Sequence, residues 1–140
     1  MIIDKLLQVS NEQAVTASAA STDVIDFGQV NPNSGLNDNV TLAITVDEAA
    51  TAAGAATVVF SIQDSADNSS FADVYTSAVI GKATLVAGYQ LLMPIPYKLR
   101  RYFRVYYTVA TGPLTAGKFS AQVVTGMQQN TAYPDSAKIA

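Results

Sequence analysis

Apolar and polar residues alternate with a period of two along much of the chain. The clearest segment is 39–46, where positions 40, 42, 44 and 46 are Val, Leu, Ile and Val, and the positions between them are Thr, Ala and Thr. An extended strand sends successive side chains to opposite faces, so this segment is predicted to be a strand with one buried face.

Three further segments, 56–63, 99–110 and 118–125, repeat this alternation, and residues 22–27, 74–80 and 89–95 are shorter candidate strands. About seven or eight strands at regular spacing in one domain predict an all-β fold, an antiparallel β-sandwich of jelly-roll-like form. The side chains expected to point into its core are those of Val58, Phe60, Ile62, Phe103, Val105, Tyr107, Val109, Phe119, Ala121 and Val123.

Polar, proline-containing and Ala-rich stretches separate these segments. Residues 64–70 read Asp-Ser-Ala-Asp-Asn-Ser-Ser, and such a polar loop between apolar runs predicts a hairpin or a short corner. Pro94 and Pro96 indicate that the strand over 89–95 ends there or lies at a sheet edge, because proline has no N–H to donate to a ladder. The Ala-rich residues 48–56 are compatible with one helical turn or with a loop.

The same pattern divides the chain into three parts. Residues 1–21 lack clean alternation and are interpreted as an extended N-terminal arm. Residues 22–125 form the predicted β-sandwich domain, and residues 126–140 are interpreted as a C-terminal tail. Chain ends without a core pattern are usually loose unless a partner holds them.

The amino-acid composition excludes several kinds of catalytic and metal site. The chain has 140 residues and contains no His, no Cys and no Trp. It therefore cannot build a Cys- or His-ligated metal site, a thiol nucleophile or a Ser-His-Asp triad. We expect no catalytic residues, no metal and no cofactor, and we do not expect an enzyme.

Charge and hydropathy bear on the partners and the location. Only 14% of the residues are charged and the net charge is −3, whereas a nucleic-acid-binding domain normally carries a basic face, so nucleic acid is not an expected partner. No apolar run approaches the roughly 20 residues of a membrane-spanning helix, and the start of the chain does not resemble a secretory signal. We expect no membrane association, and synthesis and use in a cytoplasm.

Three carboxylates, Asp64, Asp67 and Asp73, cluster around one predicted loop. The first interpretation is a solvated turn in which Asp and Asn cap nearby backbone groups. The second is a Ca²⁺ site, although the alternating ligands, central Gly and terminal Glu of an EF-hand loop are missing. The third is a pair of carboxylates for hydrolysis, as in glycosidases.

Four of the eight basic residues lie within one short segment, at Lys98, Arg100, Arg101 and Arg104. On the strand predicted over 99–110, Arg100 and Arg104 share a face with Tyr102 and Tyr106. Tyr and Arg are enriched in protein interfaces. The same face is also compatible with Arg stems covering Tyr rings on an ordinary outer surface, or with base stacking, which the acidic balance disfavours.

Several stretches carry a resemblance to a known family. They are Met-Ile-Ile-Asp-Lys at 1–5, Ala-Val-Thr-Ala-Ser-Ala-Ala-Ser-Thr-Asp-Val-Ile-Asp-Phe-Gly at 14–28, Ala-Ala-Thr-Val at 55–58, Ser-Ala-Asp at 65–67, Phe71, Ala-Gly at 87–88, Arg-Tyr-Phe-Arg-Val-Tyr-Tyr at 101–107, and residues 112–117. Over about residues 1–125 the chain resembles small tailed-phage capsid cement (decoration) proteins. Residues 29–37, which are richer in Asn and Pro, depart from that pattern, and the tail is not covered.

The resemblance implies a bacteriophage structural protein of the virion, assembled in the host bacterial cytoplasm, that decorates and stabilises the capsid surface. It implies self-association, as a dimer or trimer, and binding across seams between major capsid protein subunits. The alternatives are a virion carbohydrate- or receptor-binding jelly roll with Tyr89, Tyr102 or Tyr106 as an aromatic platform, and a hydrolase built on the acidic loop. The candidate partner-interface residues are Ile2, Ile3, Leu6, Leu7, Val9, Arg100, Tyr102, Arg104, Tyr106 and Tyr133.

Overall fold

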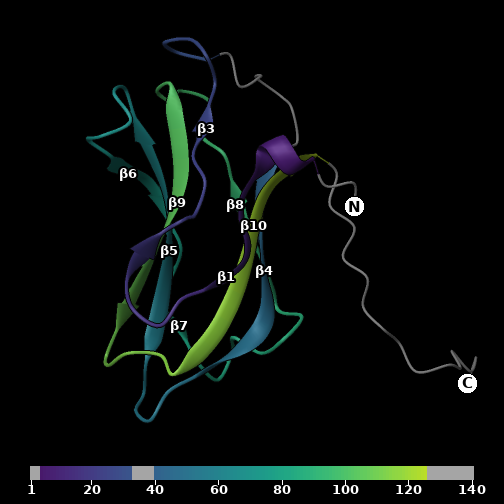
Figure 1. Ribbon diagram of the computed structural model, residues 1–140, viewed down its shortest axis with the longest axis vertical. Helices are drawn as coiled ribbons and strands as arrows, with labels where there is room; N and C mark the ends of the chain where they lie inside the picture. Colours follow the sequence, from purple (N-terminus) through teal and green to yellow (C-terminus); the bar gives the residue numbers. More distant parts are fainter. Residues whose placement is uncertain (1–3, 33–39, 126–140) are drawn as a thin grey trace, which may run out of the picture.

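The computed structural model describes residues 4–32 and 40–125, and these form one β-sandwich (Figure 1). Within those ranges the only helical element is a short 3-10 turn, η1 (Lys5–Leu7). Among the same residues, no helix is long and apolar enough to serve as a membrane span. The strands are β1 (Gln8–Ala14), β2 (Ala19–Ala20), β3 (Ile25–Asp26), β4 (Val40–Thr51), β5 (Thr57–Ser65), β6 (Ala72–Thr76), β7 (Ile80–Gly81), β8 (Gln90–Pro94), β9 (Tyr102–Ala110) and β10 (Ala116–Thr125).

Two antiparallel sheets make up the sandwich. One has the strand order β1-β10-β4-β8, and the other has the order β2-β9-β5-β6, with β3 also pairing β9 and β7 also pairing β5. The pairs are nested: β1 with β10, β2 with β9, β4 with β8, and β5 with β6. This is the wrapped antiparallel arrangement of a jelly roll. The predicted fold is confirmed, with the two-residue strands β3 and β7 added to the eight strands of the nested pairs.

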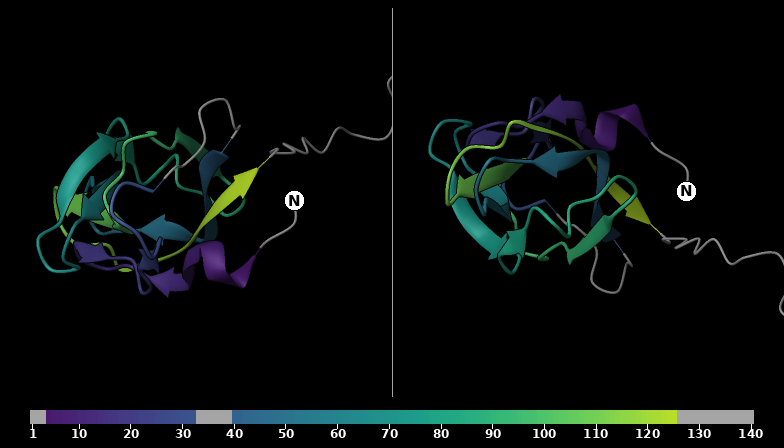
Figure 2. Two further views of the ribbon diagram at one scale, coloured as in Figure 1. Left: turned by 90° about the horizontal axis from the view of Figure 1, so that it is seen from above. Right: turned by 90° about the horizontal axis from the view of Figure 1, so that it is seen from below.

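The strands with unbroken alternation bury the side chains that the pattern predicts. Most of the expected inward residues are fully buried, and Val109 and Val123 are partly buried against the same core. Seen from either end, the strands surround this interior (Figure 2). The confirmed core residues are Val58, Phe60, Ile62, Phe103, Val105, Tyr107, Phe119 and Ala121.

An aromatic cluster joins the two sheets at the centre of the core. The rings of Phe60, Tyr107 and Phe119 have centroids 5.5–5.8 Å apart. The Tyr107 hydroxyl donates a hydrogen bond to Ser10 Oγ on β1, at 2.7 Å. Burial raises the pKa of Tyr107, because an ionised phenolate would lose its hydration there. The core therefore holds β9 of one sheet against β1 of the other.

The interpretation of residues 1–21 as an extended arm is wrong from Gln8 onward, since residues 8–14 form a paired edge strand. Val9 is 0% exposed, so its side chain belongs to the core and is not available to a partner. The pairing of β1 with β10 shifts register between Gln8 and Ser10 and again before Gln13, and Glu12 has a positive φ of 46°. Such bulges break the period of two, which explains why the sequence shows no clean alternation here.

The Ala-rich segment 48–56 is partly a strand, because β4 continues to Thr51. Gly117 faces Ala50 across the sheet with a φ of 152°, and a Cβ on Gly117 would lie 3.4 Å from the Ala50 Cα atom. Small residues therefore allow β4 and β10 to approach closely at this end, and only the residues after Thr51 form the expected loop. The edge position predicted from Pro94 is confirmed, since β8 is an edge strand that ends at this residue.

Candidate functional site

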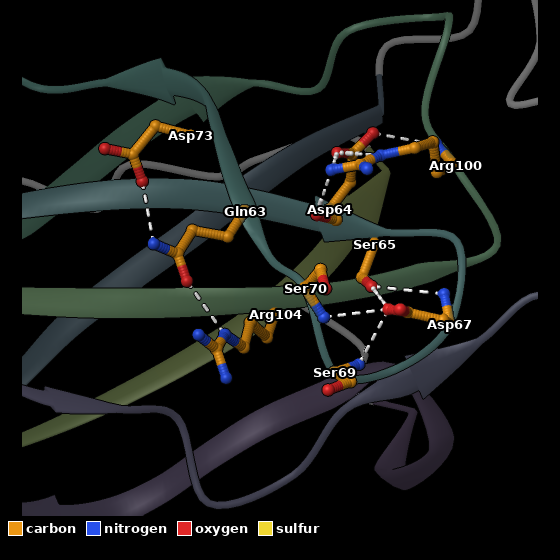
Figure 3. A network of polar contacts seen from close by, with 9 residues as sticks. All are labelled: Gln63, Asp64, Ser65, Asp67, Ser69, Ser70, Asp73, Arg100 and Arg104. Atoms are coloured by element: carbon orange, nitrogen blue, oxygen red, sulfur yellow. Dashed lines mark hydrogen bonds and ion pairs between the residues drawn. The ribbon is translucent and has the colours of Figure 1, made fainter.

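The candidate site lies on the outer face of the second sheet, where β9, β5 and β6 run side by side. The register places Arg104 opposite Gln63, and Gln63 opposite Asp73. These three side chains form a row across three strands (Figure 3). Alternation along β5 explains the row, because Ile62 points into the core and Gln63 must then point outward.

Hydrogen bonds and ring contacts order this row. Arg104 Nε donates to Gln63 Oε1 at 2.8 Å, and Gln63 Nε2 donates to Asp73 Oδ1 at 2.8 Å. The Arg104 guanidinium carbon lies 3.7 Å from the centroid of the Phe71 ring and 5.9 Å from that of Tyr106. We call these five residues, Gln63, Phe71, Asp73, Arg104 and Tyr106, the Arg104 surface.

Arg104 differs in its electrostatics from the other two arginines. Arg100 and Arg101 each form an ion pair, whereas Arg104 has no carboxylate within 4.0 Å in the part of the chain that the structure describes. Burial lowers the pKa of Arg104, because the charged guanidinium is partly removed from water. An arginine remains charged under all ordinary conditions. The surface therefore presents an ordered and partly desolvated cation.

Arg100 has a structural role, which corrects its predicted place beside Arg104 on one strand face. β9 begins at Tyr102, and Arg100 lies in the corner before it. Its backbone N–H donates to Asp64 Oδ2 at 2.8 Å, its Nε to Asp64 Oδ1 at 2.7 Å, and its Nη2 to the Asp64 carbonyl oxygen at 2.6 Å. The Asp64 side chain is only 7% exposed, so this contact fixes the corner against the end of β5.

The acidic loop does not bring its three carboxylates together. Asp64 is buried against Arg100, and Asp73 accepts a hydrogen bond from Gln63. Asp67 caps the hairpin turn: its Oδ1 accepts from the N–H groups of Ser69 and Ser70, at 2.9 and 2.8 Å, and from a Ser65 hydroxyl (Figure 3). These bonds hold the pKa of Asp67 well below its usual range.

The structure therefore confirms the solvated-turn interpretation for Asp67 and corrects it for Asp64, which is buried. Among residues 4–32 and 40–125, no group of three or more acidic residues is placed to hold a metal ion. The hairpin predicted over residues 64–70 is confirmed by the pairing of β5 with β6.

The other predicted interface residues fall in different environments. Leu6, in η1, is 83% exposed, while Leu7 packs against the core. Tyr102 and Tyr106 are half-buried on β9. Arg101, which lies over the Tyr102 ring, is paired to Asp26 at 2.7 Å. Ile2, Ile3 and Tyr133 lie outside the described residues.

Comparison with known families identifies a matching family. The family model named Bbp16 matches residues 9–123. The chain belongs to the Bbp16 family. The matched range begins in β1 and ends in β10, so it spans the whole sandwich and includes the strand that sequence analysis interpreted as an arm. No curated protein matches the chain.

A second surface feature of this Bbp16-family chain lies on the other sheet. It is a polar depression of about 310 Å³. The lining residues, which carry amide, hydroxyl and carboxylate groups, are Gln8, Asn11, Glu12, Thr45, Asp47, Gln90, Ser120 and Gln122. Tyr89, a predicted platform residue, packs against the core instead, and Tyr102 and Tyr106 belong to the opposite sheet.

Alternation along β9 predicted the outward positions of Arg104 and Tyr106, but not their contacts with Phe71, Gln63 and Asp73. A signal for Gln63 was present, because alternation in β5 sends it outward beside an arginine-bearing strand. The hairpin over residues 64–70 then brings Phe71 and Asp73 back to the same face. These contacts depend on the register between strands, and the pattern within one segment of sequence does not give that register.

Proposed function

We propose that this protein is a structural component of a tailed-phage virion, and that it decorates and stabilises the capsid by bridging major capsid protein subunits. The proposal has two parts. The first is that the molecule works by docking through buried surface. The second is that the docking partner is the capsid shell.

The observation that carries the docking part is the Arg104 surface. Arginine and aromatic residues dominate the energetic centres of protein interfaces. Here Arg104 is ordered by Phe71 and Gln63 on a rigid sheet, and no carboxylate among the described residues pairs with it. Because the side chain is held before a partner arrives, binding would lose less conformational entropy than it would with a free arginine.

The capsid part rests on sequence resemblance and is compatible with the fold. Residues 1–5 and 14–28 resemble the start of small capsid cement proteins. Jelly rolls are frequent in viral shells, although the same fold also serves lectins and enzymes, so the fold alone assigns no function. A decorating protein present in many copies would also gain from multivalency, since several weak contacts on one particle strengthen one another.

The most direct test is the copy number of this protein in purified virions, measured by quantitative mass spectrometry against the major capsid protein. We expect a fixed stoichiometric ratio, and a lower melting temperature for particles assembled without it. If virions contain only trace amounts and are equally stable without it, the capsid proposal is wrong.

The polar depression favours one alternative, a virion module that binds carbohydrate or a receptor. Its amide and carboxylate groups suit sugar hydroxyls. None of its lining residues in the described part of the chain is aromatic, however, and the half-buried tyrosine candidates Tyr102 and Tyr106 lie on the other sheet. A glycan array separates the two ideas: saccharide binding that Asp47→Asn or Gln90→Ala abolishes, and Tyr102→Ala leaves intact, would favour the alternative.

A further inference from the structure

The N–H groups of Arg104 differ in whether they donate hydrogen bonds within the described residues. A guanidinium carries five N–H donors in a planar fork. Nε donates to Gln63, whereas neither Nη group donates to any residue in the described ranges. The four N–H groups of Nη1 and Nη2, which point away from Gln63, are therefore available to an acceptor outside the described residues.

The position of the fork is fixed from two directions. The Phe71 ring packs against its flat face at 3.7 Å, and the chain of hydrogen bonds through Gln63 to Asp73 holds its Nε edge. The Asp73 carboxylate does not contact the guanidinium itself, because Gln63 lies between them. An incoming acceptor would therefore meet an oriented cation that no carboxylate of residues 4–32 and 40–125 pairs.

A carboxylate fits this arrangement better than a phosphate chain does. Two parallel N–H donors match the two oxygens of a carboxylate. A nucleic-acid backbone would need several cations along its path, whereas this surface holds one cation together with Asp73, and the chain has a net charge of −3. Phe71 and Tyr106 border the fork, and such aromatic surroundings are typical of protein interfaces.

We propose that the Arg104 surface is a receptor for one Asp or Glu side chain of a protein partner, bound end-on by Nη1 and Nη2. This inference rests on the proposed function, because we take the partner to be the major capsid protein. It adds the chemistry of the contact: an acidic residue on the shell, facing β9 and β6, that supplies the carboxylate which Arg104 does not find among the residues that the structure describes.

The test is sedimentation of the full-length protein with DNA-free shells of the major capsid protein from the phage that encodes it. The variants are Arg104→Lys, which keeps the charge and loses the fork, and Arg104→Gln, which loses both. Gln63→Leu keeps the arginine and removes the acceptor that orients it. Arg101→Gln is the matched control. It also removes one positive charge, but at an arginine that is already paired to Asp26.

We expect Arg104→Lys and Arg104→Gln to weaken shell binding about tenfold or more, as loss of a bidentate charged contact does. Gln63→Leu should weaken binding by a smaller factor, and Arg101→Gln should leave it nearly unchanged. Melting curves of the free variants check that each one is folded. If an Arg104 variant does not fold, Gln63→Leu still tests the proposal, because it retains Arg104 and should weaken shell binding.

The remaining outcomes distinguish failure of the carboxylate receptor from failure of the proposed function. Native protein that binds shells no better than its Arg104→Lys variant refutes the carboxylate receptor and leaves the capsid proposal standing. Equal losses for Arg101→Gln and Arg104→Gln indicate general charge attraction, which also refutes the receptor. Native protein that does not bind shells at all refutes the proposed function, and this inference fails with it.

Discussion

Two arginines four positions apart in the chain are used in opposite ways. Arg100 donates three hydrogen bonds to Asp64, whose side chain is 7% exposed. Within the described ranges, Arg104 donates one hydrogen bond, to the neutral amide of Gln63. Gln63 and Asp64 are neighbours on β5, so the strand turns an amide toward Arg104 and places a carboxylate at the corner that Arg100 occupies.

The acceptor, and not the arginine itself, therefore decides which role each arginine has. The buried Asp64 carboxylate accepts hydrogen bonds from both the guanidinium and the backbone N–H of Arg100. These bonds hold together two segments that are 36 residues apart in the chain. A half-buried amide orients Arg104 and leaves its charge unpaired among the described residues. We therefore expect changes at the Arg100 corner to reduce stability, and changes at Arg104 to reduce binding with little loss of stability.

The largest effect is expected for Asp64→Ala. It removes the carboxylate that accepts two hydrogen bonds and leaves Arg100 without its counter-charge, as the loss of one partner of a buried pair does. Because the Arg100 side chain is 39% exposed and water can reach it, we expect a loss of about 2–4 kcal/mol in the free energy of unfolding. Urea denaturation measures it.

The matched control is Asp73→Ala, which removes an exposed carboxylate from the same hairpin. Its loss should be below about 0.5 kcal/mol, as for most surface substitutions. If the two variants lose the same free energy of unfolding, the buried contact between Asp64 and Arg100 contributes no more to stability than a surface carboxylate does. The distinction between Arg100 and Arg104 would then be wrong.

Arg100→Lys tests the geometry of the corner with its charge retained. A lysine cannot present a planar fork, so the Nε contact with the Asp64 carboxylate and the Nη2 contact with the Asp64 carbonyl cannot both form. We expect a loss of about 1–2 kcal/mol in the free energy of unfolding, smaller than for Asp64→Ala because the ion pair partly survives. Arg101→Lys, at an exposed pair, should change stability much less.

The sequence predicted the strands whose alternation is unbroken. Phe60 and Tyr107 were placed in the core because their segments repeat with a period of two, and the structure buries both. The edge strand β1 was missed because its bulges interrupt the repeat at Glu12. Regular patterns thus predict regular strands, while local irregularity hides a strand whose pairing with β10 depends on residues far away in the chain.

The candidate site was only half predictable for a related reason. Alternation along β9 placed Tyr102, Arg104 and Tyr106 on one outer face. The ring under Arg104 and the amide at its Nε come from β5 and the hairpin after it, so they depend on register between strands. The buried ion pair between Arg100 and Asp64 was missed because it forms at a corner, where no periodicity applies.

A smaller effect on stability is expected for Arg104→Gln. Arg104 makes one hydrogen bond to a neutral acceptor and one close contact with an aromatic ring, which contributes about 0.5–1 kcal/mol at an exposed site. The loss in the free energy of unfolding should stay below about 1 kcal/mol in the same urea experiment. A loss as large as that of Asp64→Ala would assign Arg104 a structural role and contradict the proposed docking surface.

The smallest effect concerns the third arginine and depends on pH. Arg101 and the N–H of Gly28 both donate to Asp26, which lowers the pKa of Asp26 from its ordinary 3.8 to about 2. Because the folded-state pKa is the lower one, the contribution of Asp26 to stability is present above about pH 4 and is lost as the pH falls toward 2. The free energy of unfolding of Asp26→Asn should therefore differ from that of the native protein by a constant amount above about pH 4, and the difference should shrink as the pH falls through about 2.

Urea denaturation of both proteins across this pH range, with an NMR titration of the Asp26 carboxyl, measures the effect. Both side chains of the pair are more than one third exposed, so high salt should reduce the difference. A carboxyl that titrates at its ordinary pKa would contradict the prediction and show that Arg101 does not hold Asp26 in solution. Arg101 would then also be an unpaired exposed cation, and it could no longer serve as the control for Arg104.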